Sequence, residues 1–225
     1  MELTILMPCL NEEKTLHSCI KEAKEYLEKQ HFTWEILVVD NGSMDDSVRI
    51  AKENGARVII CKEKGYGNAI RAGLKAARGR YVIYGDCDMS YDFKESGKIY
   101  ELLLDGAEFV AGDRFHPIPD KKAMCLSHRI GVPVLSWIGR VRYKVNVHDF
   151  HCGFIGIKKS CAEQLNLNSS GMEFSTEIIG KAAMAKLSIK QVPVTLRPDG
   201  RDSPPHLRTW HDGMRHLLYM LKSNK

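Results

Sequence analysis

Two aspartates separated by one residue are the sharpest chemical feature of the sequence. Asp86 and Asp88 follow directly after the apolar segment 80–85. Alternate side chains of an extended backbone point the same way, so both carboxylates can face one cation beyond the end of a strand. Oxygen ligands of this kind suit Mg²⁺ or Mn²⁺, which keep positions open for phosphate oxygens. The pair therefore predicts a divalent metal site, with a solvated acidic turn as the alternative.

Two polar loops follow other predicted strands. Asp40 opens the segment DNGS, whose side chains can bind a ribose or a base, or simply form a helix-capping turn. Gly67 lies in the segment GYGN before a predicted helix, where backbone N–H groups can approach phosphate. Ile70 stands where the third glycine of a dinucleotide-binding pattern would be, so that fold is weakly supported.

Three carboxylates in the second half are considered for catalytic work. Asp149 lies in the segment HDFHC, whose His and Cys spacing fits no standard zinc site. Asp149 is therefore considered for acid–base or charge-stabilising chemistry. Glu173 and Glu177 are four residues apart on a predicted helix, where a solvated helix face is the alternative for at least one of them.

Segment 197–208 combines prolines and a glycine with cationic side chains and is predicted to be a loop. A diphosphate needs positive donors, and a mobile loop can deliver them after the substrate enters. The candidate diphosphate ligands on this loop are Arg197, Arg201, His206 and Arg208.

Strand and helix patterns alternate through the first half of the chain. The predicted strands are 3–7, 35–39, 57–61 and 80–85, and the predicted helices 12–29 and 66–78, with a further helix start at a capping box, Ser43 to Asp46. Such alternation predicts an α/β fold, a mostly parallel central sheet with helices on both faces. Ligands of these sheets bind beyond the carboxyl ends of the strands, which carry the acidic residues here.

The second half is less regular. Segment 123–140 is apolar but contains Pro133, so any helix there is expected to be broken or bent. Segments 154–157 and 189–196 are predicted strands, and 173–184 and 209–221 are predicted helices. Without a repeat or linker, residues 1–225 are predicted to form one domain, with a nucleotide-binding half (1–112) and an acceptor-side half (113–225).

Composition narrows the class of protein. The 225 residues carry 33 Lys+Arg and 28 Asp+Glu, a net charge of +5, and 44% are apolar, which is typical of a globular protein. No dense basic tract with interleaved aromatics is present, so nucleic acid is disfavoured as a partner. The seven cysteines, without a C-x-x-C pair, indicate reduced thiols in a cytoplasmic protein.

Taken together, these motifs resemble those of the family 2 inverting glycosyltransferases of GT-A fold. The likeness is strongest to the polyprenyl-phosphate (dolichol-phosphate) mannose and glucose synthases. The segments that carry it run in family order along nearly the whole chain: MPCLNEEKTL, VVDNGSMDDS, KGYGNAIRAGLKAARGRYVIYGDCDMSYDF, GDRF, DFHCGF, GMEFSTEIIGKA and PDGRDSPPHLRTWHDGMRH.

The resemblance implies roles for individual residues. Pro8, Asn11, Glu12 and Asp40 would hold the base and ribose of the donor. Asp86 and Asp88 would lie on the diphosphate and its metal, Arg114 near phosphate, and Asp149 at the reaction centre. Asn41 replaces the second aspartate of the common D-D-G-S motif.

The implied reaction is transfer of a hexose, with inversion, from a UDP- or GDP-sugar to a polyprenyl phosphate, with Mg²⁺ or Mn²⁺ as cofactor. A lipid phosphate is already anionic and needs no strong base, so Asp149 can orient groups or balance charge. A hydroxyl acceptor needs a base, for which Asp149 or Glu177 is the candidate. A soluble or saccharide hydroxyl acceptor and a non-catalytic sugar-nucleotide-binding subunit remain the alternatives.

Peripheral contact with the inner face of a membrane, or with a membrane-protein partner, is also expected. The longest uncharged run in the apolar middle, 130–139, is well short of the roughly 20 residues that span a bilayer. Apolar segment 123–140 has basic flanks, which favours an interfacial anchor. The apolar face of the last helix is expected instead to pack on the sheet; its members are Trp210, Met214, Leu217, Leu218 and Leu221.

Overall fold

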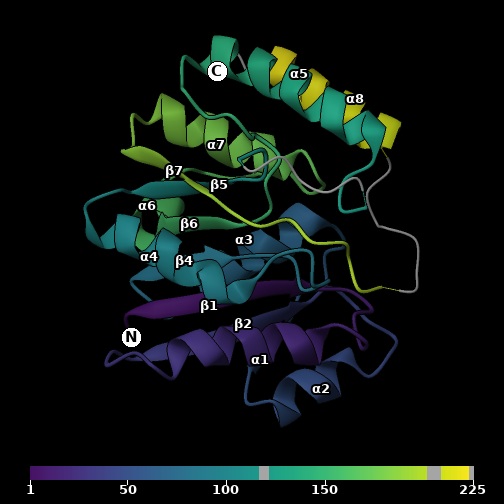
Figure 1. Cartoon of the computed structure of the whole chain (residues 1–225), viewed down its shortest axis with the longest axis vertical. Helices are drawn as coiled ribbons and strands as arrows, with labels where there is room; N and C mark the ends of the chain where they lie inside the picture. The colour runs from purple at the N-terminus through teal and green to yellow at the C-terminus, as the bar shows by residue number, and fades with distance from the viewer. Residues whose placement is uncertain (117–121, 202–208, 223–225) are drawn as a thin grey trace.

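The computed structural model describes residues 1–116, 122–201 and 209–222. Within these residues one seven-stranded sheet has the order β3-β2-β1-β4-β6-β5-β7 (Figure 1). Its strands are β1 (Leu3–Cys9), β2 (Trp34–Asp40), β3 (Arg57–Ile60), β4 (Tyr81–Tyr84), β5 (Phe109–Asp113), β6 (Ile155–Lys158) and β7 (Ile189–Pro193). Only β6 runs antiparallel to its neighbours β4 and β5, so the predicted, mostly parallel sheet is confirmed.

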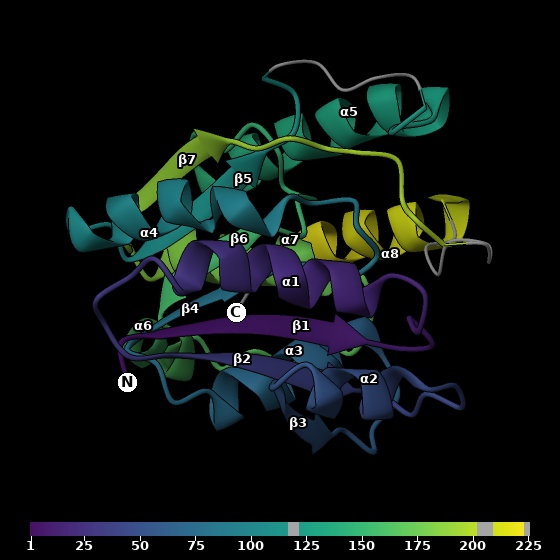
Figure 2. The same ribbon diagram turned by 60° about the horizontal axis from the view of Figure 1, so that its bottom comes forward.

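Helices cover both faces of the sheet, as predicted. One face packs against α1 and α4, and the other against α3, α6 and α7 (Figures 1 and 2). The helices are α1 (Leu16–Leu27), α2 (Ser47–Glu53), α3 (Tyr66–Ala76), α4 (Ser96–Leu104), α5 (Leu126–Tyr143), α6 (Lys159–Gln164), α7 (Phe174–Met184) and α8 (Thr209–Lys222), with a 3₁₀ turn η1 (Phe93–Glu95).

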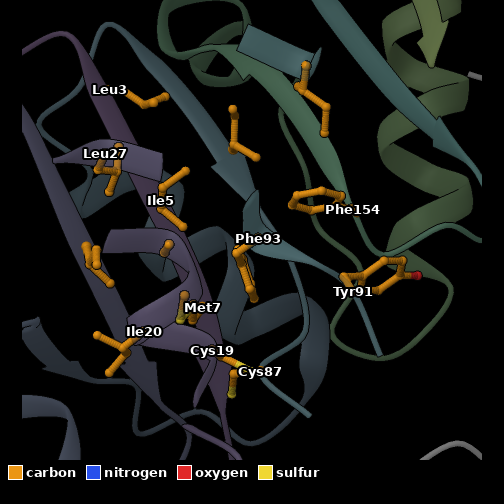
Figure 3. Packing of buried hydrophobic residues seen from close by; sticks show 14 of the residues in the cluster. Leu3, Ile5, Met7, Cys19, Ile20, Leu27, Cys87, Tyr91, Phe93 and Phe154 are labelled. Carbon is orange, nitrogen blue, oxygen red and sulfur yellow. The ribbon is translucent and has the colours of Figure 1, made fainter. Parts of the chain in front are cut away.

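Alternation along β1 shows how the sheet divides the core. Ile5 and Met7 enter the cluster beneath α1, whereas Leu6 enters the cluster on the opposite face. Phe93 and Phe154 extend the first cluster toward β6, with their rings at 79° and their centroids 5.6 Å apart (Figure 3). Buried apolar side chains thus cover both faces of the sheet among the described residues.

Three expectations about local structure need revision. The helix in the apolar segment 123–140, α5, begins at Leu126 and continues past Pro133 to Tyr143, so it is not broken there, because Pro133 removes a single backbone donor and the flanking turns persist. A bend at Pro133 stays a prediction. Ser43 and Asp46 form no capping box: α2 begins at Ser47, and the amide of Ser43 instead binds the Asp40 carboxylate. The strand predicted at 189–196 ends at Pro193.

The last helix, α8, exposes its predicted apolar face and does not pack it on the sheet. On α8 the buried residues are Asp212, His216 and Met220, spaced four apart. Four members of the predicted face are exposed large apolar residues: Trp210, Met214, Leu218 and Leu221. The expectation that this face packs on the sheet is therefore wrong.

An exposed apolar stripe also runs along α5, which lies beside α8 (Figure 1). Its members share one side of the helix: Leu126, Ile130, Val134, Trp137 and Val141. We call the stripes of α5 and α8 together the apolar surface. No helix within the described parts of the chain is long and apolar enough to cross a membrane.

Candidate active site

A pocket of about 610 Å³ opens at the carboxyl ends of β1 and β4. Parallel strands end at the same edge, so the loops after them converge there. Pro8, Glu12, Asp86, Asp88 and Arg201 line the end of the pocket that these loops form. The other end is lined by residues of α5, α7 and α8 and by Arg114. Six of the predicted site residues are thus brought to one cavity from segments far apart in the sequence.

Asp86 and Asp88 share this cavity, as predicted. Burial, followed by the neighbouring charge of Asp88, raises the pKa of Asp86 to about 7. The Tyr66 hydroxyl forms a hydrogen bond with Asp86 and opposes that rise in pKa. Asp88 accepts hydrogen bonds at Oδ1 from the amide and hydroxyl of Ser90, which leave Oδ2 directed elsewhere. Two carboxylates whose charges repel one another in a partly desolvated place form a site that favours a cation.

A guanidinium already supplies positive charge there. Arg201 Nη2 donates to Asp88 Oδ2 at 2.7 Å, and Nη1 donates to Glu12 Oε1 at 3.1 Å. Burial raises the pKa of Glu12, although the charge of Arg201 opposes that rise. Arg201 therefore ties the segment after β7 to both the β1 loop and the Asp86–Asp88 loop. His206 and Arg208, the other predicted cations of this loop, lie outside the described residues.

Oxygen-only donors and local negative charge fit Mg²⁺ or Mn²⁺. Asp86 and Asp88 line the same pocket, and the charge of Asp88 contributes, after burial, to the raised pKa of Asp86. Asp86 and Asp88 are accordingly the residues that would hold the metal.

Hydrogen bonds join the loops that follow β1 and β2. The Asp40 carboxylate binds the amides of Gly42 and Ser43, and the Asn11 side chain accepts from the amide of Met44. Neither Asp40 nor Asn11 lines the pocket among the described residues; both fix the conformation of the loop that follows β2. Their roles toward the nucleotide stay predictions.

Asn41 does line the pocket. Its amide donates to the carbonyls of Cys61 and Glu63, and its Oδ1 accepts from the amide of Gly65. Gly65 has φ of 129°, and a Cβ there would lie 2.2 Å from the carbonyl oxygen of Ser170, so only glycine fits. Nearby Gly67, predicted to approach phosphate, directs its amide to Ser170 instead and lies outside the pocket lining.

Asp149 is completely buried and paired with Arg114. Arg114 Nε and Nη2 donate to the two carboxylate oxygens at 2.6 and 2.9 Å, and the amide of His151 donates to Oδ1 at 3.1 Å. Arg114 lines the pocket, whereas Asp149 is not among the described lining residues. Asp149 therefore orients the Arg114 guanidinium from behind the pocket wall.

Glu177 is likewise buried away from the pocket. Its carboxylate accepts hydrogen bonds from the amides of Asn168 and Ser169 and pairs with Lys181 at 2.8 Å. These partners lower the pKa of Glu177 despite its burial. Through these hydrogen bonds Glu177 holds the loop that precedes α7. The predicted catalytic role of Glu177 stays a prediction.

Histidines gather at the other end of the pocket. His151 has both ring nitrogens buried and without a hydrogen-bond partner within the described residues, and its ring centroid lies 4.3 Å from that of His216. His216 Nδ1 lies 2.8 Å from Thr176 Oγ1. Burial lowers the pKa of His216 to about 4 and holds that of His151 well below its ordinary value. Both imidazoles are thus neutral at pH 7.

Sequence reasoning missed His216, Tyr66 and Arg215, and it considered His151 only as a zinc ligand. Arg215 lines the pocket from α8 and donates to Glu173 at 2.7 Å. The sequence signal for His216 is its position four residues after Asp212, which puts both polar side chains on one face of the last helix. Nothing in the spacing indicates that α8 turns this face, and not its apolar one, toward the pocket.

Comparison with known proteins adds independent evidence. The model of the family described as "Glycosyl transferase family 2" matches residues 4–165. The hexosyltransferase Agl6 of low-salt glycan biosynthesis from Haloferax volcanii is 36% identical over 221 residues, which are 97% of this chain and 53% of that protein. This chain thus spans about half the length of that relative. A dolichyl-phosphate beta-glucosyltransferase from Drosophila melanogaster is 29% identical over 219 residues, covering 86% of this chain and 66% of that protein.

A solved structure supports the fold. Glucosyl-3-phosphoglycerate synthase from Mycobacterium tuberculosis, crystallised with Mn²⁺, UDP and glucosyl-3-phosphoglycerate, superposes with a TM-score of 0.75 at 22% identity. The match covers 98% of this chain and 78% of that one. It confirms the predicted GT-A architecture, and the family model covers most of the chain. The chain belongs to glycosyl transferase family 2.

Proposed function

We propose that this protein is a metal-dependent hexosyltransferase that takes its sugar from a UDP- or GDP-sugar. The observation that carries the proposal is the Asp86–Asp88 pair facing Arg201 in one pocket at the carboxyl edge of the sheet. A nucleotide diphosphate sugar needs this combination of acidic metal ligands and mobile positive charge. Family membership and a relative named as a hexosyltransferase support the same activity.

The donor lies in the 1–112 half of the pocket in this proposal. Pro8, Glu12 and Asn41 face the nucleoside, on loops fixed by Asp40 and Asn11. A divalent cation held by Asp86 and Asp88 would neutralise charge that develops on the departing diphosphate.

Two arginines add to that charge stabilisation. Arg201 can exchange its bonds to Asp88 and Glu12 for phosphate oxygens when the donor arrives, because both sets of partners are anionic. Arg114 is held by Asp149 with its guanidinium at the cavity wall. In the donor end of the pocket the described carboxylates are Asp86, Asp88 and Glu12, and Glu12 is held by Arg201; Asp212, on α8, lines the other end.

That arrangement suits an acceptor that is already ionised. Residues 113–225 supply the acceptor end, which is lined by Arg114, the neutral His151, and residues of α5 and α8 that include the neutral His216. A phosphate monoester attacks without losing a proton to a strong base, whereas a sugar hydroxyl needs one. A polyprenyl phosphate is the acceptor that this end fits, and the relative named as a dolichyl-phosphate glucosyltransferase supports it.

The apolar surface supports a lipid acceptor for a second reason. α5 and α8 line the acceptor end with residues such as Ser127 and His216 and present their apolar stripes outward. Lys122, Arg140 and Arg142 flank the stripe of α5, and basic residues near an anionic surface each add about 1 kcal/mol of attraction. Peripheral attachment through this surface would place the pocket at the lipid headgroups. Seven free cysteines agree with a reducing, cytoplasmic side of that membrane.

A transfer assay tests this function. The protein is incubated with radiolabelled UDP- or GDP-hexose, Mn²⁺ and vesicles that contain polyprenyl phosphate, and label is followed into the organic phase. We expect lipid-linked label with wild-type protein and none with Asp88→Asn or with excess EDTA. Label found only in a water-soluble product would show that the acceptor is soluble. Donor binding without turnover on any acceptor would identify a non-catalytic binding subunit.

A further inference from the structure

A second group of potential metal ligands lies outside the pocket. Asp113 ends β5, His116 follows it in the next turn, and His148 comes from the segment that precedes β6. One ligand atom from each of the three residues lies within 4.8 Å of the other two. None of the three lines the pocket that holds Asp86 and Asp88. Among the described residues this is a group of three that could share one ion, separate from the predicted donor site.

The distances between these atoms suit coordination. His116 Nδ1 lies 2.9 Å and His148 Nδ1 3.4 Å from the same oxygen, Asp113 Oδ2. Ligands about 2.0–2.2 Å from a tetrahedral ion lie about 3.3 Å from one another. Asp113 Oδ1 accepts from the amide of Phe115, which fixes the carboxylate with Oδ2 toward the imidazoles. Small rotations of two exposed imidazoles would complete the geometry.

We propose that Asp113, His116 and His148 form a binding site for a transition metal ion of the Zn²⁺ class. Two imidazoles and one carboxylate favour Zn²⁺, Co²⁺ or Ni²⁺, whereas the oxygen-only pair Asp86 and Asp88 favours Mg²⁺ or Mn²⁺. The exposure of the His116 and His148 side chains, 65% and 44%, gives the ion an entry path and leaves room for water ligands. The sequence alone conceals this site, because its ligands come from segments more than 30 residues apart.

The site would act on the pocket as a clamp. Asp113 precedes Arg114, and His148 precedes Asp149, so two ligands are each adjacent in sequence to one member of the buried pair. An ion that joins them fixes the end of β5 to the segment before β6. It thereby restricts the motion of the Arg114 guanidinium at the pocket wall without touching substrate. Asp113, His116 and His148 are positioning residues in this account, and the metal site does not depend on the proposed sugar transfer.

The test separates the two metal sites. Asp88→Asn protein, with the donor site disabled, is titrated with Zn²⁺ against a chromophoric chelator and with Co²⁺ by visible absorption. We expect one equivalent of Zn²⁺ and a Co²⁺ spectrum typical of mixed nitrogen and oxygen ligands. Adding His116→Gln or His148→Gln should weaken Zn²⁺ binding by at least about tenfold, since even second-shell changes at metal sites cost that much. Adding His31→Gln, an exposed histidine elsewhere, serves as the matched control.

Thermal unfolding gives a second readout. Zn²⁺ should raise the melting temperature of the Asp88→Asn protein and of its His31→Gln derivative, but not of the two ligand variants, because binding to the native state stabilises it. Both altered histidines are exposed, so these variants should melt normally without metal. Failure of the Asp88→Asn protein to bind Zn²⁺, or equal binding by all variants, would overturn the proposal and leave two imidazoles that only hydrogen-bond to Asp113.

Discussion

Replacing Asp149 by Asn separates a positioning role from a base. Asp149 is fully buried and holds Arg114 through hydrogen bonds of 2.6 and 2.9 Å. Removing one partner of a buried ion pair costs about 3–5 kcal/mol of stability. A positioned donor at a developing charge contributes about 10²–10³ in kcat. If Asp149 acts through Arg114, Asp149→Asn should lose turnover within that range because Arg114 is no longer held.

A double-mutant cycle measures this coupling. We expect Arg114→Gln and the double variant, Arg114→Gln with Asp149→Asn, to have nearly the same kcat, because the second change removes a partner that has nothing left to orient. The double variant should also be more stable to urea than either single variant, because each single variant leaves a lone buried charge and the double variant leaves none. Kinetics and urea unfolding of the four proteins complete the cycle.

A second buried pair provides the control. Glu35, at the far end of the sheet, binds Arg57 through two hydrogen bonds of 2.8 and 3.1 Å. Glu35→Gln should cost stability on the same scale and leave kcat unchanged. If the Asp149→Asn loss instead multiplies in full with the Arg114→Gln loss, Asp149 acts directly on the reacting groups and the positioning account is refuted.

Three further outcomes follow from the structure. Arg201→Gln should tighten Mn²⁺ binding to the nucleotide-free protein by about tenfold, because the ion no longer has to displace a guanidinium that lies 2.7 Å from Asp88. Electron paramagnetic resonance of free Mn²⁺ measures the affinity, and an unchanged affinity would contradict this role of Arg201. His216, with a pKa of about 4, stays neutral in the native state while the unfolded chain takes up a proton as the pH falls below 6.5. Unfolding free energy should therefore fall toward acid pH by up to about 1.4 kcal/mol per unit, and His216→Gln should flatten the urea-derived profile between pH 7 and pH 5; an identical slope would disprove the assignment. Trp137→Ser with Trp210→Ser should abolish co-sedimentation with anionic vesicles without altering the melting temperature, and undiminished sedimentation would exclude the apolar surface as the anchor.

Six of the seven strands could be predicted from the sequence because they are short apolar runs, and several end in a polar loop. The strand β5 (Phe109–Asp113) was missed. That pattern placed Asp86, Asp88 and Glu12 at one edge, and the structure brings them together. Periodicity in α8 shows which residues share a face, but not which face turns inward. In the structure the apolar face that includes Trp210 and Met214 is exposed, while His216 lines the pocket.

Residue roles that depend on distant partners were beyond the sequence. Asp149 looks like a reactive carboxylate until Arg114, 35 positions away, is seen to occupy both of its oxygens. Glu177 likewise has its hydrogen-bonding capacity taken by Asn168, Ser169 and Lys181. The sequence identifies carboxylates that can do chemistry, whereas burial and bonding partners decide which of them face a substrate.

In the proposed reaction Asp86 and Asp88 hold the metal of the nucleotide diphosphate donor. Crystals grown with Mn²⁺ and UDP or GDP, measured at a wavelength where Mn²⁺ scatters anomalously, test this role most directly. One strong anomalous peak is expected between the two carboxylates and the diphosphate, with Arg201 released from Asp88 onto a phosphate oxygen. A bound nucleotide whose diphosphate carries no metal at Asp86 or Asp88, with Arg201 still paired to Asp88, would contradict it.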